Sequence, residues 1–381
     1  MKVAILGTRG IPNKYGGFEQ FAEYFSVGFV AKGYEVTVYC PHLHDFNEAE
    51  FKGVKIKKIY CPEDKFGSSA HFIFDYLCMK DALQQQFDIL YESGYGTSVF
   101  AYYLLNKKSP LIVTNMDGLE WKRSKWNFLT RKLMRRLEKI AVKKSDYIIS
   151  DNRGIQEYYK KEFNRDSFYI PYGGEISTGF DENILSDYGL KKHGYFVLVA
   201  RLEPENNIEM ILDGYIMSKS KNPFIVIGSP ETKYGKFLLE KYKAYPAIKF
   251  VGSIYDRAVT QSLRHFSQIY FHGHTVGGTN PSLLEAMGDR AFIIAHDNLF
   301  NRGVVSKDNL FFSSKEEIAK HINAFDTYRS LQPALIKANI DRIVEHFNWE
   351  NVVDSYENLF RKLLRENIKT GNSTKPSVNF R

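Results

Sequence analysis

The sequence is poor in cysteine and lacks any long hydrophobic run. Its three cysteines, Cys40, Cys61 and Cys78, stand far apart among 381 residues and form no C-x-x-C pair. Cysteines spaced in this way are typical of free thiols in a reducing compartment, and they argue against a zinc site. No segment approaches the roughly 18–20 apolar residues that a membrane-spanning helix needs. We therefore expect a cytoplasmic protein that is soluble or peripheral to a membrane.

Several familiar motifs are also missing. The opening segment, MKVAILGTRG, lacks the apolar region and cleavage site of a signal peptide. Gly7-x-x-Gly10 does not complete a GxGxxG fingerprint, and no acid follows the second expected strand at the right place, so we do not expect NAD. No DxD motif follows a strand. We therefore expect no metal, and Arg201 with helix dipoles would supply the positive charge near a diphosphate.

The length of the chain and its charge set the next limits. A chain of 381 residues is long enough for two domains of ordinary size. The net charge of +8 is compatible with nucleic acid, a membrane surface or an anionic substrate as partner. The basic residues concentrate between Lys122 and Lys144, where ten of them stand against one acid, Glu138.

Short apolar segments alternate with helical segments through both halves of the chain. Strands are expected at residues 2–6, 35–39, 54–59, 89–91, 111–114, 147–150, 168–170, 196–200, 224–227, 248–251, 269–271 and 292–295. This alternation predicts an α/β protein with two doubly wound parallel sheets, which would face each other across a cleft. We expect an N-terminal domain (1–172), a linker (173–192), a C-terminal domain (193–345), a helix returning to the first domain (346–366) and a flexible tail (367–381).

A glycine-rich loop in the second half predicts an anion site. The segment Gly277-Gly278-Thr279-Asn280 follows an expected strand, and Pro281 suits the first turn of a helix that Asn280 would cap. The free N–H groups and the positive dipole end at such a helix start favour phosphate or diphosphate. Glu285, one turn further, would reach a sugar hydroxyl. Alternatively, Ser282-x-x-Glu285 is a capping box, in which the carboxylate only satisfies a backbone N–H.

Two other segments of the second half carry candidate ligand groups. Arg201 directly follows an expected strand, where it would clamp a diphosphate and offset the charge of a leaving group. A salt bridge with Glu203 or Glu205 is the alternative role. In the loop after another strand, Gly252 would let a flat base approach the backbone, with Tyr255 beside it.

The first half carries a dense group of polar residues and a basic helix. The polar group follows an expected strand and comprises Asp117, Glu120, Trp121, Lys122 and Arg123. It predicts ligand recognition at the sheet edge, although a polar turn would also contain such residues. The helix that follows would place Trp126, Leu129, Leu133, Leu137, Ile140 and Ala141 on one face. Its basic residues, which include Arg131, Lys132, Arg135, Arg136 and Lys139, favour contact with anionic lipid or phosphate over a merely solvated face.

Five segments together resemble the retaining, metal-independent glycosyltransferases of family 4, which have the GT-B fold. They are GTRGIPNKYGGFE, NMDGLEWKRSKW, ARLEPENNI, GGTNPSLLEAM and DNLFNR, in this order. The combination is similar to a branch that includes bacterial rhamnosyltransferases of surface polysaccharide synthesis. The resemblance covers most of residues 1–360.

The resemblance implies residue roles. Arg201 would hold the donor diphosphate, Glu285 would contact the nucleotide ribose, and Asp117 would act on the acceptor side. Gly277, Gly278, Thr279 and Asn280 would bind phosphate or donor sugar, together with Gly16, Gly17 and Asn206. Three positions depart from the wider family, because Gly277, Asn206 and Gly303 stand where a Glu, a Lys and an acid are usual.

The resemblance implies transfer of L-rhamnose from dTDP-rhamnose. The basic residues between 122 and 144 suggest that the acceptor is a polyprenyl-diphosphate-linked sugar at the inner membrane face. A UDP-hexose or a UDP-N-acetylhexosamine is an alternative donor. A hydrolysing nucleotide-sugar epimerase would need carboxylates in the cleft, for which Asp117 and Glu120 are the candidates. A non-enzymatic nucleic-acid binder would use the basic stretch, but the sequence contains no recognised nucleic-acid module and such a role leaves the glycine loops unexplained.

Overall fold

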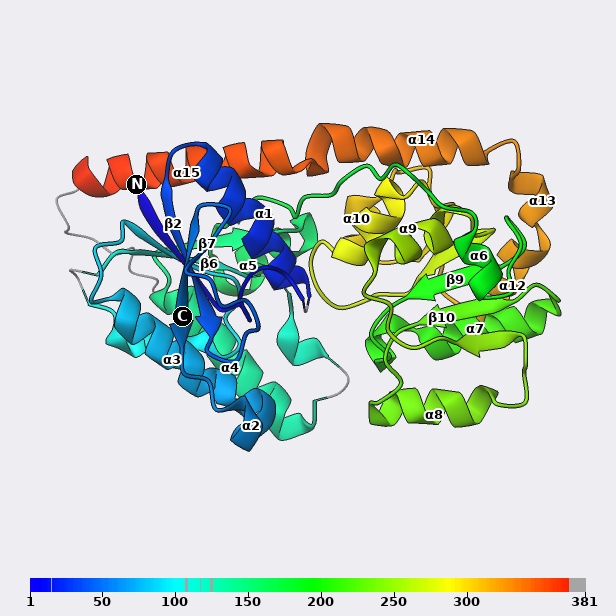
Figure 1. Ribbon diagram of the computed structural model, residues 1–381, viewed down its shortest axis with the longest axis horizontal. Helices are drawn as coiled ribbons and strands as arrows, with labels where there is room; N and C mark the ends of the chain where they lie inside the picture. The colour runs from blue at the N-terminus through cyan, green and yellow to red at the C-terminus, as the bar shows by residue number, and fades with distance from the viewer. Residues whose placement is uncertain (15, 107–108, 117, 124–125, 370–381) are drawn as a thin grey trace. The chain divides into compact units, whose positions relative to one another are not determined.

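A computed structural model describes residues 1–14, 16–106, 109–116, 118–123 and 126–369 (Figure 1). The chain groups into two compact units. Unit 1 contains Met1–Lys122, Trp126–Tyr172 and the C-terminal segment from Trp349, and unit 2 contains Gly173–Asn348 together with Arg123. Each unit is built on its own twisted sheet, which confirms the predicted α/β class with two doubly wound sheets.

The sheet of unit 1 has eight strands in the order β3-β4-β2-β1-β5-β6-β7-β8. The strands are β1 Lys2–Leu6, β2 Glu35–Pro41, β3 Glu50–Phe51, β4 Val54–Ile59, β5 Ile89–Glu92, β6 Leu111–Asn115, β7 Tyr147–Ser150 and β8 Phe168–Tyr169. All pairs are parallel except β3 with β4. Because helices cover both faces of a parallel sheet, its central strands are buried and mainly apolar, as in Val3–Leu6 of β1 and Leu111–Val113 of β6.

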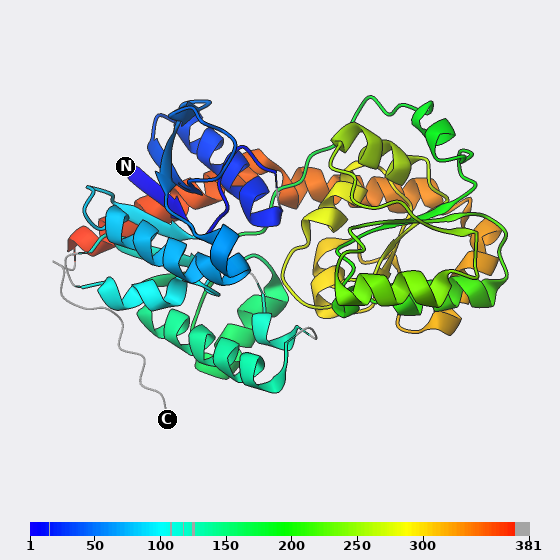
Figure 2. The ribbon, with the colours of Figure 1, turned by 60° about the horizontal axis from the view of Figure 1, so that its bottom comes forward.

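The longer helices of unit 1 are α1 Gly17–Ala31, α3 Ala70–Ala82, α4 Phe128–Lys144, α5 Arg153–Phe163 and α15 Trp349–Lys369. Shorter ones are α2 Glu63–Phe66, η1 Gly67–Ser69, η2 Ser98–Leu104 and η3 Glu120–Lys122. The C-terminal helix α15 lies along α1 in both views (Figures 1 and 2), where aromatic rings interlock. The ring centroids of Phe25 and Tyr356 are 4.8 Å apart, and those of Phe29 and Phe360 are 5.8 Å apart.

The sheet of unit 2 has six parallel strands in the order β11-β10-β9-β12-β13-β14. They are β9 Phe196–Val199, β10 Phe224–Ile227, β11 Ile248–Phe250, β12 Ile269–His272, β13 Ile293–His296 and β14 Leu310–Phe312. Its helices are α6 Ile184–Asp187, η4 Pro204–Asn206, α7 Ile208–Ser218, α8 Lys233–Tyr242, α9 Arg257–His265, α10 Pro281–Gly288, α11 Leu299–Val304, α12 Lys315–Asn323, α13 Phe325–Tyr328, α14 Gln332–Arg342 and the π-helix η5 Ile343–Phe347. In Figure 1, α9 and α10 lie on one side of β9 and β10, and α7 and α8 lie on the other.

The segment expected to be a linker, residues 173–192, packs into unit 2. The Ser177 backbone N–H donates to the Gly288 carbonyl at 3.1 Å, and the Asp181 N–H donates to Ser262 Oγ at 3.1 Å. The segment also contains α6. These contacts anchor it beside α9 and α10.

The apolar face expected on α4 packs inward only in the second half of the helix. Leu137 and Ala141 are buried, whereas Leu129 and Leu133 are 73% and 43% exposed. Helical periodicity identifies a common apolar face, but it does not say how far the rest of the protein extends along that face.

Glu138 is the acid of the basic helix, and it is fully buried. Its carboxylate accepts hydrogen bonds from the hydroxyls of Tyr158 at 3.0 Å and Tyr159 at 3.1 Å. Burial raises the pKa of Glu138 from 4.5 to about 7, against the effect of these bonds. The folded state therefore keeps a proton that the unfolded chain releases above pH 4.5. The free energy of unfolding falls as pH rises through this window.

We predict that Glu138→Gln is more stable than the wild type at pH 8, and that this gain is smaller at pH 5. The neutral amide avoids the buried charge, so the gain at pH 8 should be about 1–3 kcal/mol, since one pKa unit corresponds to about 1.36 kcal/mol. Urea unfolding of both proteins at the two pH values measures it. Glu157→Gln, which changes an exposed acid of α5, is the matched control and should leave the pH dependence as in the wild type. Parallel pH profiles for Glu138→Gln and the wild type would contradict the prediction.

Candidate functional site

The carboxyl ends of β9 and β12 lie side by side at the point where the strand order of unit 2 reverses. Open α/β sheets bind their ligands at such a point, because the loops after the two strands diverge to opposite faces of the sheet. Arg201 follows β9, and the glycine-rich loop follows β12. The structure thus brings these two predicted segments together.

Hydrogen bonds join the two loops directly. Asn207 Nδ2 donates to the Gly273 carbonyl at 2.7 Å. Thr275 donates to the Glu205 carbonyl from its backbone N–H at 3.1 Å and from its hydroxyl at 2.8 Å. Gly273 passes so close that a Cβ there would lie 2.0 Å from the Asn206 carbonyl oxygen. A side chain at position 273 would therefore separate the loops.

Asn206 connects Arg201 with a histidine that the sequence reasoning missed. Its Nδ2 donates to the Arg201 carbonyl at 2.7 Å, and its Oδ1 lies 2.7 Å from Nδ1 of His274. Burial, followed by the guanidinium groups of Arg123 and Arg201, lowers the pKa of His274 to about 4. The imidazole is therefore neutral at physiological pH. The only signal in the sequence was the pair His272-x-His274 at the end of a strand.

The polar residues after β13 hold the same segment from its other side. The side-chain amides of Asn298 and Asn301 both donate to the His274 carbonyl at 3.0 Å. Arg302 forms a two-point ion pair with Asp297 at 2.5 and 2.8 Å. Two of the polar residues in the DNLFNR segment therefore hold the site in place.

Position 303, where the resemblance leads one to expect an acid, lies inside α11. The carbonyls of Gly303 and Val304 accept hydrogen bonds from the Arg342 guanidinium at 2.8 and 2.6 Å. At position 303, a backbone carbonyl and not an acidic side chain therefore contacts a cation, the Arg342 guanidinium.

The start of α10 has the predicted cap. Asn280 is the N-cap and its side chain accepts the Ser282 N–H at 2.9 Å, while Pro281 is the first helical residue. Both expectations are confirmed. Gly278 and Thr279 are buried just before the cap. The helix start therefore directs its dipole toward the loop that Arg201 also borders.

Glu285 is held by a buried arginine. Its Oε2 lies 2.6 Å from Nη2 of Arg264, whose Nη1 lies 2.9 Å from Asp289. The side chains of Arg264 and Asp289 are 4% and 3% exposed. The capping-box alternative is wrong, because Asn280 is the cap and Ser282 Oγ lies 2.9 Å from the Tyr270 hydroxyl. The sequence offered no sign of Arg264.

The predicted base site lies further along the sheet. Gly252 and Tyr255 follow β11, which is two strands away from β9. The Gly252 carbonyl accepts the Gly228 N–H at 2.8 Å, and Tyr255 is 82% exposed. Their role in base binding remains a prediction.

The predicted residues of unit 1 lie at the start of α1 and in η3. Gly16 caps α1 and Gly17 is its first residue. Glu120, Trp121 and Lys122 form η3, and the Trp121 ring lies 5.4 Å from Nζ of Lys122 and 4.7 Å from the Arg135 guanidinium. Asp117 lies outside the described residues. Arg123 groups with unit 2, where its Nη1 is 3.7 Å from Glu205.

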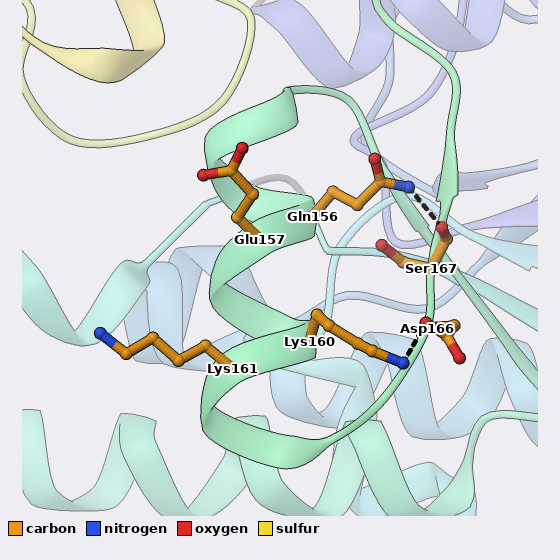
Figure 3. A pocket seen from close by; sticks show the side chains of 6 residues that line it. All are labelled: Gln156, Glu157, Lys160, Lys161, Asp166 and Ser167. Atoms are coloured by element: carbon orange, nitrogen blue, oxygen red, sulfur yellow. Dashed lines mark hydrogen bonds and ion pairs between the residues drawn. The ribbon is translucent and has the colours of Figure 1, made fainter.

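Unit 1 contains two further groups of polar side chains that lie apart from the predicted site residues. Cys61, Glu63 and His71 place ligand atoms within 4.8 Å of one another, but Glu63 lies 3.6 Å from Arg9, so its charge is already paired. We assign no metal to this group. A pocket beside α5 (Figure 3) is lined by Gln156, Glu157, Lys160, Lys161, Asp166 and Ser167. It contains none of the predicted site residues.

Two family models match the chain. Residues 1–175 match a domain of unknown function, DUF1972, and residues 181–342 match the glycosyl transferases of group 1. An uncharacterized glycosyltransferase of Methanocaldococcus jannaschii is 27% identical over 246 residues, which are 59% of this chain and 61% of that protein. The chain therefore spans about three fifths of the length of this curated relative.

Solved structures show the same fold over nearly the whole chain. Sucrose-phosphate synthase from Thermosynechococcus elongatus has a TM-score of 0.78 and 16% identity, covering 96% of this chain and 99% of its own. Anabaena HepE in complex with UDP and glucose has a TM-score of 0.72 and 15% identity, covering 95% and 100%. The predicted GT-B fold is confirmed, and residues 181–342 match the glycosyl transferases of group 1.

We predict that Arg264→Met destabilises unit 2 strongly. The change leaves Asp289 buried without its cation, which typically costs about 3–5 kcal/mol. Urea unfolding measures the loss. Arg329→Met is the matched control, because Arg329 forms an exposed ion pair with Asp326 that should be worth no more than about 1 kcal/mol. Equal stability of the two variants would show that Arg264 does not hold α10.

Proposed function

We propose that this protein is a retaining, metal-independent glycosyltransferase that transfers a sugar from a nucleoside diphosphate donor to a hydroxyl. The proposal rests on one observation. Arg201 and the start of α10 follow the neighbouring strands β9 and β12, where the strand order reverses, in the part of the chain that matches the group 1 model. A guanidinium and a helix N-terminus together favour a diphosphate. Our first choice of donor is dTDP-rhamnose, based on the five-segment resemblance.

The proposed reaction needs only positioning and charge stabilisation from these residues. The bond between the sugar anomeric carbon and the diphosphate oxygen breaks, and the acceptor oxygen bonds to that carbon on the same face. The acceptor proton passes to the leaving diphosphate, whose charge Arg201 and the α10 dipole stabilise. Glu285 would bind the ribose. Its ion pair with Arg264 holds the carboxylate in place for this contact.

The remaining roles are proposals from the resemblance. Gly277, Gly278, Thr279 and Asn280 would line the donor phosphate and sugar. Gly16 and Gly17 would serve the donor, and the acceptor-side residues of unit 1 would be Asp117, Glu120, Trp121 and Lys122, with Arg123. A UDP-hexose is the alternative donor, which the HepE structures with UDP-glucose support by likeness of fold.

The surface of α4 supports a membrane-bound acceptor. Phe128 is 77% exposed, and Leu129 and Leu133 are also exposed. They stand beside the basic set Arg131, Lys132, Arg135, Arg136 and Lys139. Exposed apolar and basic side chains on one helix are typical of attachment to anionic lipid. In the part of the chain that the structure describes, no helix is long and apolar enough to cross a bilayer.

We therefore propose attachment to the cytoplasmic face of the inner membrane. There the protein would meet a polyprenyl-diphosphate-linked sugar as its acceptor.

We predict that one nucleoside diphosphate raises the melting temperature and that Arg201→Ala removes most of this shift. A ligand at 100 times its dissociation constant adds about 2.7 kcal/mol of stability. The panel is dTDP, UDP, GDP, ADP and NAD. Preference for dTDP supports a rhamnosyl donor, and preference for UDP supports a UDP-hexose. No shift with any diphosphate would contradict the proposed function.

In the transfer assay, Arg201→Ala should lower kcat by more than about tenfold, because a charged contact to a leaving group is worth about 2–4 kcal/mol. Arg329→Ala, which removes an exposed arginine of unit 2, should leave kcat unchanged.

We predict that Lys/Arg→Gln changes at the five basic residues of α4 weaken binding to anionic liposomes by more than about tenfold, since each contributes about 1 kcal/mol near the surface. Sedimentation with liposomes at several salt concentrations measures the effect. The matched control removes the same charge from unit 2, at Lys221, Lys233, Lys236, Lys243 and Lys320. Equal weakening by both sets would indicate a general charge effect and argue against α4 as the membrane surface.

A further inference from the structure

Different helices cover the two faces of the unit 1 sheet. On one face, the ring of Tyr91 in β5 packs against α15, with the centroid of Tyr356 at 5.6 Å, and α15 packs against α1. On the other face, Tyr102 of η2 shares a hydrogen bond of 2.7 Å with the hydroxyl of Thr114 in β6. Tyr91 pairs with Val113, so Tyr91 and Thr114 point to opposite faces of the sheet. Helices α3 and α4 both pack against η2, on the face away from α1 and α15 (Figure 1).

The outer surface of α2, α3, η2 and α4 is rich in exposed apolar side chains, and we call it the apolar surface of unit 1. Eight large apolar side chains are exposed there: Phe66, Ile73, Tyr76, Phe100, Tyr103, Phe128, Leu129 and Leu133. Among their described residues, α1 and α15 together expose one such side chain, Ile368. Single exposed apolar side chains are ordinary, but a group of them on adjacent elements marks a contact with another apolar phase or partner.

Side-chain contacts connect the elements of this surface. The ring centroids of Phe72 in α3 and Phe100 in η2 are 5.6 Å apart. Nζ of Lys144, at the end of α4, lies 4.9 Å from the ring of Tyr103 in η2. Phe100 and Tyr103 are three residues apart in a 3₁₀ helix, so their side chains project to the same side. The apolar surface is therefore continuous from α3 across η2 to α4.

The exposed charges on these elements are almost all positive. Asp64 is the one exposed acid that the structure describes on α2, α3, η2 and α4. The exposed bases are Lys65, Lys80, Arg131, Lys132, Arg135, Arg136, Lys139 and Lys143. Aromatic rings among lysines and arginines fit an anionic bilayer, where the rings lie at headgroup level and the cations meet lipid phosphates. A second copy of the chain would instead bring its own positive charges to the contact, which disfavours self-association.

We propose that unit 1 binds an anionic bilayer through its whole apolar surface, and that side chains of α3 and η2 insert among the lipids. This proposal rests on the proposed function, in which α4 meets the membrane, and it adds the apolar part of that contact. The inserting side chains, which we call the apolar set, are Ile73, Tyr76, Phe100 and Tyr103. Their burial supplies binding that salt does not screen, whereas the basic residues of α4 supply binding that salt weakens.

Serine at all four positions of the apolar set tests the proposal by sedimentation with vesicles of equal parts phosphatidylglycerol and phosphatidylcholine. We expect the affinity to fall by more than about tenfold, since burying even one large apolar side chain is worth about that factor. The fall should persist at about 1 M salt, where the Debye length is about 3 Å. The five Gln changes on α4 should weaken binding at low salt only. The matched control, which should bind as the wild type does, places serine at four exposed apolar positions of unit 2, Met217, Phe237, Leu239 and Tyr245.

A tryptophan probe tests insertion directly and does not depend on the stability of the serine variant. Tyr103→Trp should add fluorescence that bromine atoms on the lipid acyl chains quench, measured against the wild type with the same vesicles. Tyr245→Trp, at an exposed tyrosine of unit 2, is the matched control and should add fluorescence that these lipids do not quench. Melting temperatures close to that of the wild type show that each variant is folded.

The failures of the two proposals are distinguishable. If the folded serine variant binds vesicles as the wild type does, or if the added tryptophan at position 103 is not quenched, insertion is overturned and the transferase function stands. If the wild type binds no vesicles, insertion and membrane attachment are both overturned. If the wild type is a dimer without lipid and the serine variant is a monomer, the surface joins two copies and insertion is overturned. If vesicle binding is as expected but no nucleoside diphosphate binds, the transferase function alone is overturned.

Discussion

The site of unit 2 depends on hydrogen bonds from asparagine side chains to the loop that follows β12. Asn206 and Asn207 come from the loop after β9, and Asn298 and Asn301 come from the segment after β13. Backbone carbonyls in a loop need partners, and water would leave their positions variable. Amide side chains from the loops after β9 and β13 donate to these carbonyls at fixed distances. The segment between β12 and α10 is therefore held in position from both sides.

Charge is arranged around this segment in two layers. At the surface, Arg201 and the dipole of α10 make the site attractive to an anion. Behind the helix, Arg264 lies between Glu285 and Asp289 and is almost fully buried. A buried cation is tolerated because two carboxylates pair with it, and in return it holds Glu285 at the edge of the site.

Much of the fold and part of the site followed from local patterns. The apolar strands were predicted because buried parallel strands are continuous apolar segments, whereas the short strands β3 and β14 were not predicted. Asn280 and Pro281 were predicted because capping is a local interaction. His274 and Arg264 were missed, since their partners lie 68 and at least 21 residues away.

The sequence by itself determined the two α/β units, the glycine loop and the capped start of α10, because each depends on residues adjacent in the chain. Only the tertiary structure decided which residues share the site. The strand order places the loops after β9 and β12 together. It thereby turns Asn206 into the partner of His274, and it buries Arg264 against Glu285 and Asp289. The physical reason is that hydrogen bonds and ion pairs depend on distances in space, which crossover connections set independently of separation along the chain.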